Sequence, residues 1–187
     1  MIIFWRLVLG HFLCDFTFQT NRINEWKRSS LTGLILHCMI HPLCYIVLTY
    51  PYLFDTWITI GPLPINGLLA IFLITAIHFI EDYWRIHTIQ RFGTPDNTLY
   101  LIWDQIIHLS VIFIFFGAIS IDGLALLIPE RWPILGILAV IATHFSVVVI
   151  YFIEKDLHGK DFPGFSEKYI TIIERGLVFA AFIFVPS

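Results

Sequence analysis

The chain has 187 residues and a mass of 21.7 kDa, the size of one ordinary domain. Hydrophobic residues make up 58% of it and charged residues only 13%, with a mean hydropathy of +0.81, whereas a soluble domain carries about 25% charged residues. So little charge excludes a disordered chain or a coiled coil, and the net charge of −3 excludes a basic surface for nucleic acid. The composition therefore predicts a single transmembrane domain over residues 1–187.

Six apolar segments are each long enough to cross a hydrocarbon core of about 30 Å. They cover residues 2–20, 31–54, 63–85, 99–121, 133–153 and 168–185. Polar or Gly- and Pro-rich joints separate them at residues 21–30, 61–64, 93–97, 122–133 and 154–167. The first segment lacks the basic start and small-residue cleavage site of a secretion signal, so we expect it to stay as a helix. The sequence predicts an all-α bundle of six transmembrane helices.

The basic residues gather in the first, third and fifth joints, which hold or border eight of the eleven Lys and Arg residues. These eight are Arg22, Lys27, Arg28, Arg85, Arg91, Lys155, Lys160 and Lys168. Loops rich in Lys and Arg face the cytoplasm in membrane proteins. We therefore expect these three joints in the cytoplasm and both termini on the non-cytoplasmic side.

Four of the predicted spans contain pairs of ionisable residues. Inserting one such residue at the centre of a membrane helix costs about 2.5–3.5 kcal/mol. Within each pair the spacing is i, i+4, so both side chains project from one helix face. The pairs are His11 with Asp15, His37 with His41, His78 with Asp82, and Asp104 with His108. At 1.5 Å per residue, all four pairs lie roughly 5 to 15 Å from the predicted cytoplasmic surface. The spacing and depth predict that the pairs meet in one layer.

Imidazole and carboxylate groups in one layer are typical ligands of divalent transition metals. We expect one or two such ions, with zinc as the first choice and manganese or iron as alternatives. A hydrogen-bonded network that only joins the helices is the competing interpretation. The predicted metal ligands are His11, Asp15, His37, His41, His78, Asp82, Asp104 and His108.

The same residues, taken in order, resemble a bacterial integral membrane family catalogued as domain of unknown function 3307. His11 to Gln19 is similar to the family's opening H-x-x-x-D-F-x-L-Q pattern. The later pieces are His37-x3-His41, His78-x3-Asp82, Asp104-Gln105-x2-His108 and Glu174-Arg175. The resemblance covers almost the whole chain and implies a multi-pass protein of the bacterial inner (plasma) membrane. No activity is settled for the family, and a looser likeness in motif style to helical zinc-dependent phospholipases C is an analogy only.

Metal-dependent hydrolysis is the first functional hypothesis, acting on a lipid or phosphorylated substrate at the cytoplasmic leaflet. A metal with an open position lowers the pKa of bound water toward 7 and polarises an ester or phosphoryl oxygen. Glu174 and Arg175 are the predicted catalytic residues, the first as a general base or as a partner that supports a metal ligand, and the second as an anion-binding group. Arg85, Gln19 and Gln105 are the predicted substrate-binding residues.

Two other functions remain open. Chains of His and Asp inside a membrane also mark ion and proton pathways, so a metal-ion or proton transporter or channel is the first alternative. Against transport, the non-cytoplasmic halves of the first four spans contain almost no polar residue. A metal-stabilised structural or signalling protein is the second alternative. The expected partners are membrane lipids and an anionic or phosphorylated substrate, with no nucleic acid and an open oligomeric state.

Overall fold

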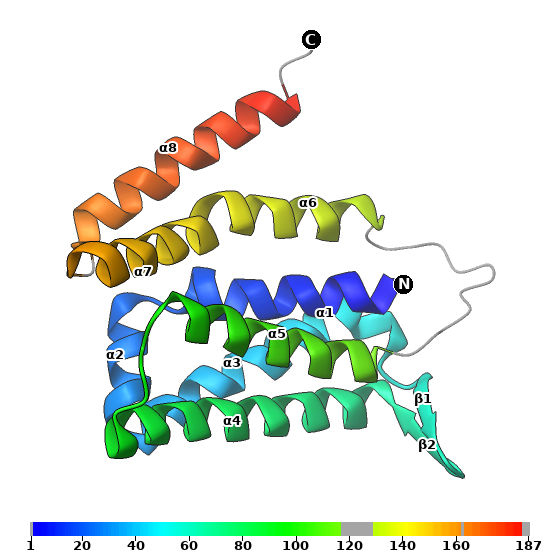
Figure 1. Ribbon diagram of the computed structural model, residues 1–187. Helices are drawn as coiled ribbons and strands as arrows, with labels where there is room; N and C mark the ends of the chain where they lie inside the picture. The colour runs from blue at the N-terminus through cyan, green and yellow to red at the C-terminus, as the bar shows by residue number, and fades with distance from the viewer. Residues whose placement is uncertain (1, 117–128, 162, 185–187) are drawn as a thin grey trace.

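The computed structural model describes residues 2–116, 129–161 and 163–184, and over these residues the protein is helical apart from one two-stranded hairpin. The elements are α1 (Ile2–Phe12), η1 (Leu13–Phe18), α2 (Asn21–Ser29), α3 (Leu31–Thr49), η2 (Tyr50–Tyr52), β1 (Thr56–Ile60), β2 (Leu63–Asn66), α4 (Gly67–Phe92), α5 (Thr98–Phe115), α6 (Arg131–Val140), η3 (Ile141–Phe145), α7 (Ser146–His158) and α8 (Phe165–Phe184). Figure 1 shows α1, α3, α4 and α5 side by side, with α6 packed along α1, α7 in contact with α5, and α8 beyond α7.

Four helices start at a side-chain oxygen that accepts the backbone N–H three residues later. These caps open α2, α3, α4 and α5 and are Thr20, Ser30, Asn66 and Asn97, at 3.3, 3.1, 2.9 and 3.0 Å. Such caps satisfy backbone donors that the first helical turn leaves free. Gly93, with a φ of 66°, ends α4 in the left-handed conformation that a helix C-terminus favours. Local sequence therefore defines where the helices around the polar layer begin and end.

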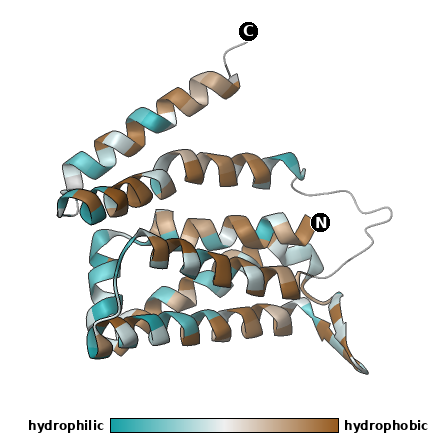
Figure 2. Ribbon diagram, in the orientation of Figure 1, coloured by the Kyte–Doolittle hydropathy of each residue, from teal (hydrophilic) through white to brown (hydrophobic). Residues whose placement is uncertain are grey.

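The first predicted span, residues 2–20, is not one straight helix. α1 continues into the π-helical turn η1, and α2 then leaves at 94° to it. Residues 21–30, predicted as a joint, are thus mostly a short helix, because capping residues bound a segment too polar for hydrocarbon. A Cβ atom on Gly33 would overlap the backbone of Trp26, so glycine lets α2 pack directly against α3. Figure 2 shows hydrophilic residues concentrated on α2 and on the end of α4 beside it.

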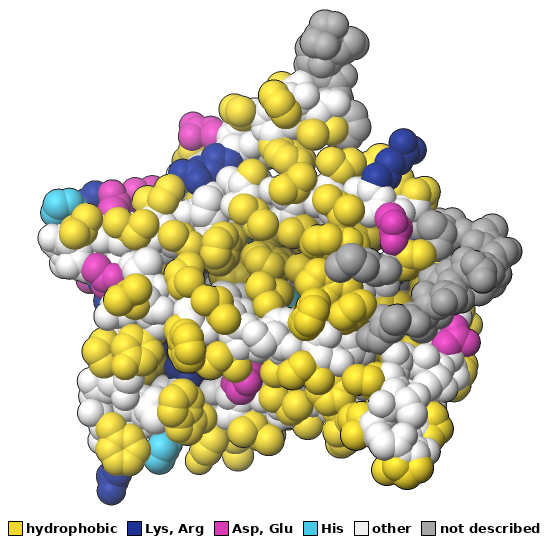
Figure 3. Space-filling view, turned by 45° about the vertical axis from the view of Figure 1, so that its right-hand side comes forward, with side chains coloured by type: hydrophobic (Ala, Val, Ile, Leu, Met, Phe, Trp, Pro, Cys, Tyr) yellow, Lys and Arg dark blue, Asp and Glu magenta, His cyan; other side chains and the backbone are white. Residues whose placement is uncertain are grey.

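Four segments among the described residues are long and apolar enough to cross a membrane, or up to five if the bent pair of α1/η1 and α2 is one span. The four are Leu31–Tyr52, Gly67–Phe92, Thr98–Phe115 and Arg131–His158. Only 22% to 33% of each apolar window is buried inside the protein, which suits helices that face lipid. Hydrophobic side chains accordingly cover much of the face shown in Figure 3.

The prediction of six spans, with both termini outside, stays a prediction. α8 is not among the four segments, because every stretch of it long enough to span also contains Glu167, Lys168, Glu174 and Arg175. The end of the predicted fourth span (117–121) and most of the following joint (122–128) lie outside the described residues.

The second joint forms a hairpin instead of a simple loop. β1 pairs antiparallel with β2 around Gly61, which has a φ of 60°. Trp57 on β1 is buried, and its Nε1 donates a hydrogen bond to the Tyr52 carbonyl oxygen at 2.8 Å. The predicted span 63–85 was therefore wrong at its start, since residues 63–66 form β2, and α4 runs from Gly67 to Phe92. The Asn66 cap explains where the helix starts.

The buried side chains between the hairpin and the predicted metal ligands are mostly apolar, with Arg6 and Thr49 as buried polar exceptions. One helical turn from the histidines of α1, α3, α4 and α5, on the hairpin side, stand Leu7, Tyr45, Ile74 and Ile112, all at most 2% exposed. This apolar layer belongs to one continuous core that also includes buried residues of α6 and the hairpin. The polar ligands are thus confined to the half of the bundle near α2 (Figure 1).

Candidate metal centre

Four helices bring the predicted ligands into one histidine–aspartate cluster. α1 and η1 provide His11 and Asp15, and the remaining members project from α3, α4 and α5. The cluster consists of His11, Asp15, His37, His41, His78, Asp82, Asp104 and His108. All of them except Asp104 are buried. The prediction that four i, i+4 pairs meet in one layer is confirmed, although their role as metal ligands stays a prediction.

Asp15 is the carboxylate that the most histidines approach. Its Oδ1 lies 3.2 Å from His41 Nε2, 3.3 Å from His37 Nε2 and 3.9 Å from His78 Nε2. Its Oδ2 lies 3.5 Å from His11 Nε2. Asp15 belongs to the π-helical turn η1, a local widening of the helix that is frequent at functional sites. Residues of α1, α3 and α4 therefore surround one carboxylate.

Asp82 on α4 forms a second centre that shares two of those histidines. Its Oδ2 lies 3.4 Å from His37 Nε2 and 3.7 Å from His78 Nε2, and its Oδ1 lies 3.8 Å from His108 Nε2. Lys27 Nζ of α2 also lies 3.1 Å from Asp82 Oδ2. The two carboxylates and their histidines are therefore one connected unit.

The nitrogen atoms of the cluster fit a metal ion. Nε2 of His78 and Nε2 of His108 are buried, and neither has a hydrogen-bond partner among the described residues. His41 Nδ1 lies 3.4 Å from the His37 carbonyl oxygen, and its Nε2 lies 3.2 Å from Asp15 Oδ1. A proton on Nδ1 would therefore leave Nε2 available to a metal ion beside Asp15. A divalent ion would satisfy all of these atoms together.

Three overlapping groups have ligand atoms within 4.8 Å of one another. The first group is His11, Asp15, His41 and His78; the second is His37, His78 and Asp82; the third is Asp82, Asp104 and His108. Each combines imidazole with carboxylate and contains no thiolate. Such ligands are typical of zinc, manganese and iron sites.

Gln105 and Glu81 support the ligands from the next layer. The Gln105 amide oxygen lies 3.1 Å from His11 Nε2, and its nitrogen donates to Asp15 at 3.4 Å and to Asp104 at 3.3 Å. Glu81 Oε2 lies 2.6 Å from His108 Nδ1. The Glu81 contact is the kind that orients a metal-binding imidazole, because it leaves Nε2 of His108 facing Asp82. Gln105, in contrast, contacts the same His11 nitrogen that faces Asp15. Gln105, predicted to bind substrate, thus bonds to three members of the cluster, and Glu81 is a partner that the pair spacing did not single out.

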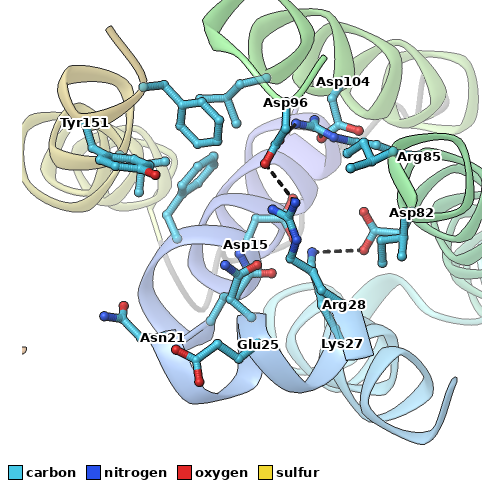
Figure 4. A pocket seen from close by; sticks show the side chains of 18 of the residues that line it. Asp15, Asn21, Glu25, Lys27, Arg28, Asp82, Arg85, Asp96, Asp104 and Tyr151 are labelled. Atoms are coloured by element: carbon cyan, nitrogen blue, oxygen red, sulfur yellow. Dashed lines mark hydrogen bonds and ion pairs between the residues drawn. The ribbon is translucent and has the colours of Figure 1, made fainter. Parts of the chain in front are cut away.

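A cavity of about 490 Å³ meets the cluster on the side of α2 (Figure 4). Asp15, Asp82 and Asp104 contribute to its wall. Predicted substrate-binding residues Gln19, Arg85 and Gln105 also line it, together with the cations Lys27, Arg28 and Lys168. The structure therefore places the predicted substrate-binding residues beside the predicted metal ligands.

Three cations meet Asp96, which lies in the short connection between α4 and α5. Arg28 approaches its carboxylate at 2.8 Å, Arg85 at 3.3 Å and Lys155 at 3.6 Å. Burial alone would raise the pKa of Asp96, but Arg28, Lys155 and Arg85 together lower it below its usual value. Sequence reasoning missed Asp96, because a single acid in a polar loop gives no periodic signal.

The predicted catalytic pair lies apart from the cluster. Glu174 is exposed on α8 and makes no hydrogen bond or ion pair with another described residue. Arg175 donates a hydrogen bond to Ser146 Oγ of α7. α8 packs against η3 and α7, and the structure does not bring Glu174 and Arg175 together with the ligands. Their catalytic roles stay predictions.

The fold and the cluster define a helical protein with several segments that could span a membrane and buried His and Asp groups that could hold a metal ion. The chain belongs to the family described as protein of unknown function (DUF3307), whose family model matches residues 3–135. That range includes every member of the histidine–aspartate cluster. The family resemblance is thereby confirmed for the motifs from His11 to His108, whereas the Glu174-Arg175 motif lies outside the matched residues. No curated protein and no solved structure matches the chain.

Proposed function

We propose that the protein is a membrane-embedded, metal-dependent hydrolase that acts on an anionic lipid or phosphorylated substrate at the cytoplasmic leaflet. The observation that carries this proposal is the shared wall between cluster and cavity. Asp15, Asp82 and Asp104 belong to the candidate ligands and also line a cavity of about 490 Å³. Sites for small molecules typically enclose about 300–1,000 Å³. A ligand in this cavity would therefore lie against the candidate metal ligands.

Zinc is the first choice for the ion, with manganese or iron as alternatives. A bound ion of this kind would supply a water of lowered pKa and polarise an ester or phosphoryl oxygen. The protein's own residues would hold the reacting groups in place. Asp104 is the best-placed proton acceptor, because it lines the cavity and Gln105 and Arg85 both hold its carboxylate. Glu174 would need α8 to approach the cluster before it could take this role.

The cavity offers cations to an anionic substrate once a metal ion is bound. Lys27, Arg28, Arg85 and Lys168 line it beside five acids, namely Asp15, Glu25, Asp82, Asp96 and Asp104, so one divalent ion would make its net charge positive. Arg85 lies 3.0 Å from Asp104 and 3.3 Å from Asp96, so it connects the ligands to the outer part of the cavity. A guanidinium group at this place suits bidentate binding of phosphate. We therefore expect a phosphate-bearing headgroup or an isoprenyl phosphate rather than a neutral lipid.

The apolar layer argues against transport as the function. Leu7, Ile74 and Ile112 are buried one turn beyond the histidines on the hairpin side. The buried Arg6 and Thr49 on that side donate hydrogen bonds to backbone carbonyl oxygens of α3. A path for ions or protons across a membrane needs polar groups along its whole length. The cavity, by contrast, lies beside α2 and its basic residues. The positive-inside rule favours the cytoplasmic leaflet for that end.

The test is hydrolysis by the purified full chain in mixed micelles. The metal-free protein is loaded with Zn²⁺, Mn²⁺ or Fe²⁺ and given phospholipids with different headgroups or an isoprenyl phosphate, and released phosphate or headgroup is measured. We expect turnover that Asp104→Asn reduces at least about 100-fold, in line with the loss of a general base. His87→Ala, at an exposed histidine of α4, is the matched control. Metal or proton flux into proteoliposomes without hydrolysis would overturn the proposal in favour of transport.

A further inference from the structure

Lys27 introduces a cation into the histidine–aspartate cluster. Its Nζ lies 3.1 Å from Asp82 Oδ2 and 3.5 Å from His37 Nε2, and only 12% of its side chain is exposed. Figure 4 shows Lys27 extending from α2 toward Asp82, with the ion pair drawn between them. These two contact atoms belong to the second group of candidate ligands. The Lys27 ammonium group therefore already contacts atoms that a metal ion in the second group would bind.

The third group is also approached by a cation. Arg85 donates to Asp104 Oδ2 at 3.0 Å. The first group differs, since no Lys or Arg within residues 2–116, 129–161 and 163–184 forms an ion pair or hydrogen bond with its members. Those members are His11, Asp15, His41 and His78. The basic side chains thus leave one group of ligands available to a metal ion.

The balance of charge leads to the same conclusion. With the histidines neutral, the four acids Asp15, Glu81, Asp82 and Asp104 face the two bases Lys27 and Arg85, which leaves two negative charges in the cluster. One divalent ion would neutralise these charges, whereas two would leave two positive charges in a largely buried site. Uncompensated buried charge is costly, because the surroundings solvate it poorly. One ion is therefore favoured over two.

We propose that the cluster binds a single metal ion at His11, Asp15, His41 and His78, and that the Lys27 ammonium takes the position of a second ion. The inference rests on the metal binding of the proposed function, and it goes further by giving the stoichiometry and the role of α2. In two-metal hydrolases the second ion helps to hold the oxygens of the reacting group. Lys27 lines the cavity and provides a fixed positive charge at that place. Lys27 is therefore a positioning residue for an anionic group beside the single ion.

The position of Lys27 depends on how α2 is held. α2 leaves η1 at 94° and packs against α3 where Gly33 leaves room for the backbone of Trp26. Lys27 is the next residue along the chain from Trp26. The close packing of these two helices therefore directs its side chain into the cluster and not into solvent.

The experiment measures the metal-to-protein ratio of the purified full chain by elemental analysis, after removal of metal and reloading with Zn²⁺ alone. We expect a ratio of about one. Asp15→Asn should lower it at least tenfold, whereas Asp82→Asn and Asp104→Asn should leave it near one. A ratio of two in the wild type overturns the inference and leaves the proposed function intact. Absence of bound zinc in the wild type overturns both.

A second pair of variants tests the role of Lys27 itself. Lys27→Met removes the charge and keeps most of the side-chain length, so a second ion should bind and the ratio should rise to about two. Lys27→Arg retains a cation and should stay at one. A folded Lys27→Met protein that still binds one ion shows that Lys27 does not hold the second position. If Lys27→Met does not fold, the contrast between Asp15→Asn and Asp82→Asn decides, and loss of zinc in Asp82→Asn overturns the inference.

Discussion

Arg28 on α2 and Asp96 before α5 form an ion pair of 2.8 Å between residues that are 68 positions apart in the sequence. Arg85 of α4 and Lys155 of α7 approach the same carboxylate. Three helices from different parts of the chain are therefore joined at one acid beside the cavity. Because that acid is only 16% exposed, loss of its charge should affect how the whole end of the bundle is held.

Stability should depend on pH through Asp96. Burial would raise its pKa, but Arg28, Lys155 and Arg85 lower it, so the folded value lies below the unfolded value of about 3.9. The stabilisation is therefore fully present above about pH 4 and is lost as the pH falls through the lower, folded pKa. We expect unfolding in detergent to become easier below about pH 4. The Asp96→Asn variant should be less stable than the wild type at neutral pH, and its stability should depend less on pH below about pH 4. If the variant and the wild type depend on pH in the same way, Asp96 is not the group responsible.

Metal binding should depend on His41 and not on an exposed histidine. His41→Ala removes a nitrogen that faces Asp15 at 3.2 Å, so zinc affinity should fall by more than the roughly 10- to 100-fold typical of supporting residues. Zinc at 100 times its dissociation constant should stabilise the wild type by about 2.7 kcal/mol. Thermal unfolding with and without zinc measures both effects. His87→Ala should behave like the wild type, and a zinc shift that survives in His41→Ala would exclude His41 as a ligand.

Substitution of Gly33 should displace α2. The added Cβ of Gly33→Ala meets the Trp26 backbone, which cannot rotate away. We expect a loss of about 1–3 kcal/mol in the free energy of unfolding, as for other overpacked sites. Gly164→Ala is the control, because nothing lies within 4 Å of the Cβ that it adds. Equal stability of the two variants would show that α2 does not pack as described.

The apolar layer should be sensitive to truncation. Leu7 is fully buried, so Leu7→Ala should cost about 2–5 kcal/mol, the range for buried leucines. Leu177→Ala on α8, at a side chain that is 67% exposed, should change stability by less than about 0.5 kcal/mol. Chemical unfolding in detergent measures both. A Leu7→Ala protein as stable as the wild type would mean that this layer is not closely packed.

Orientation in the membrane can be tested by labelling. Lys160→Cys, after α7, is predicted to face the cytoplasm, and Thr59→Cys, in the hairpin, the opposite side. A membrane-impermeant thiol reagent applied to the outer face of the inner membrane should therefore label Thr59→Cys and leave Lys160→Cys unlabelled until the membrane is broken. The reverse pattern would show that the termini and the cavity have the opposite orientation.

The polar pairs were readable from the sequence because helix geometry is local. A spacing of i, i+4 places His78 and Asp82 on one face whatever surrounds the helix, and the structure has them 3.7 Å apart. Equal depth within hydrophobic segments then predicted that the pairs of different helices meet. The same local logic failed near Gly61, where hydropathy alone does not distinguish the start of a helix from a strand of a hairpin.

Tertiary packing decided which other groups enter the cluster. Lys27 lies in a polar segment that hydropathy assigns to the surface, and only the 94° turn after η1 and the contact at Gly33 bring it to Asp82. Conversely, Glu174 lies at a suitable depth in its helix, but α8 packs on α7 and leaves it exposed. Depth is a property of one helix and follows from sequence. Which helices are neighbours depends on turns and close contacts between distant segments, so only the folded structure determines which charges meet.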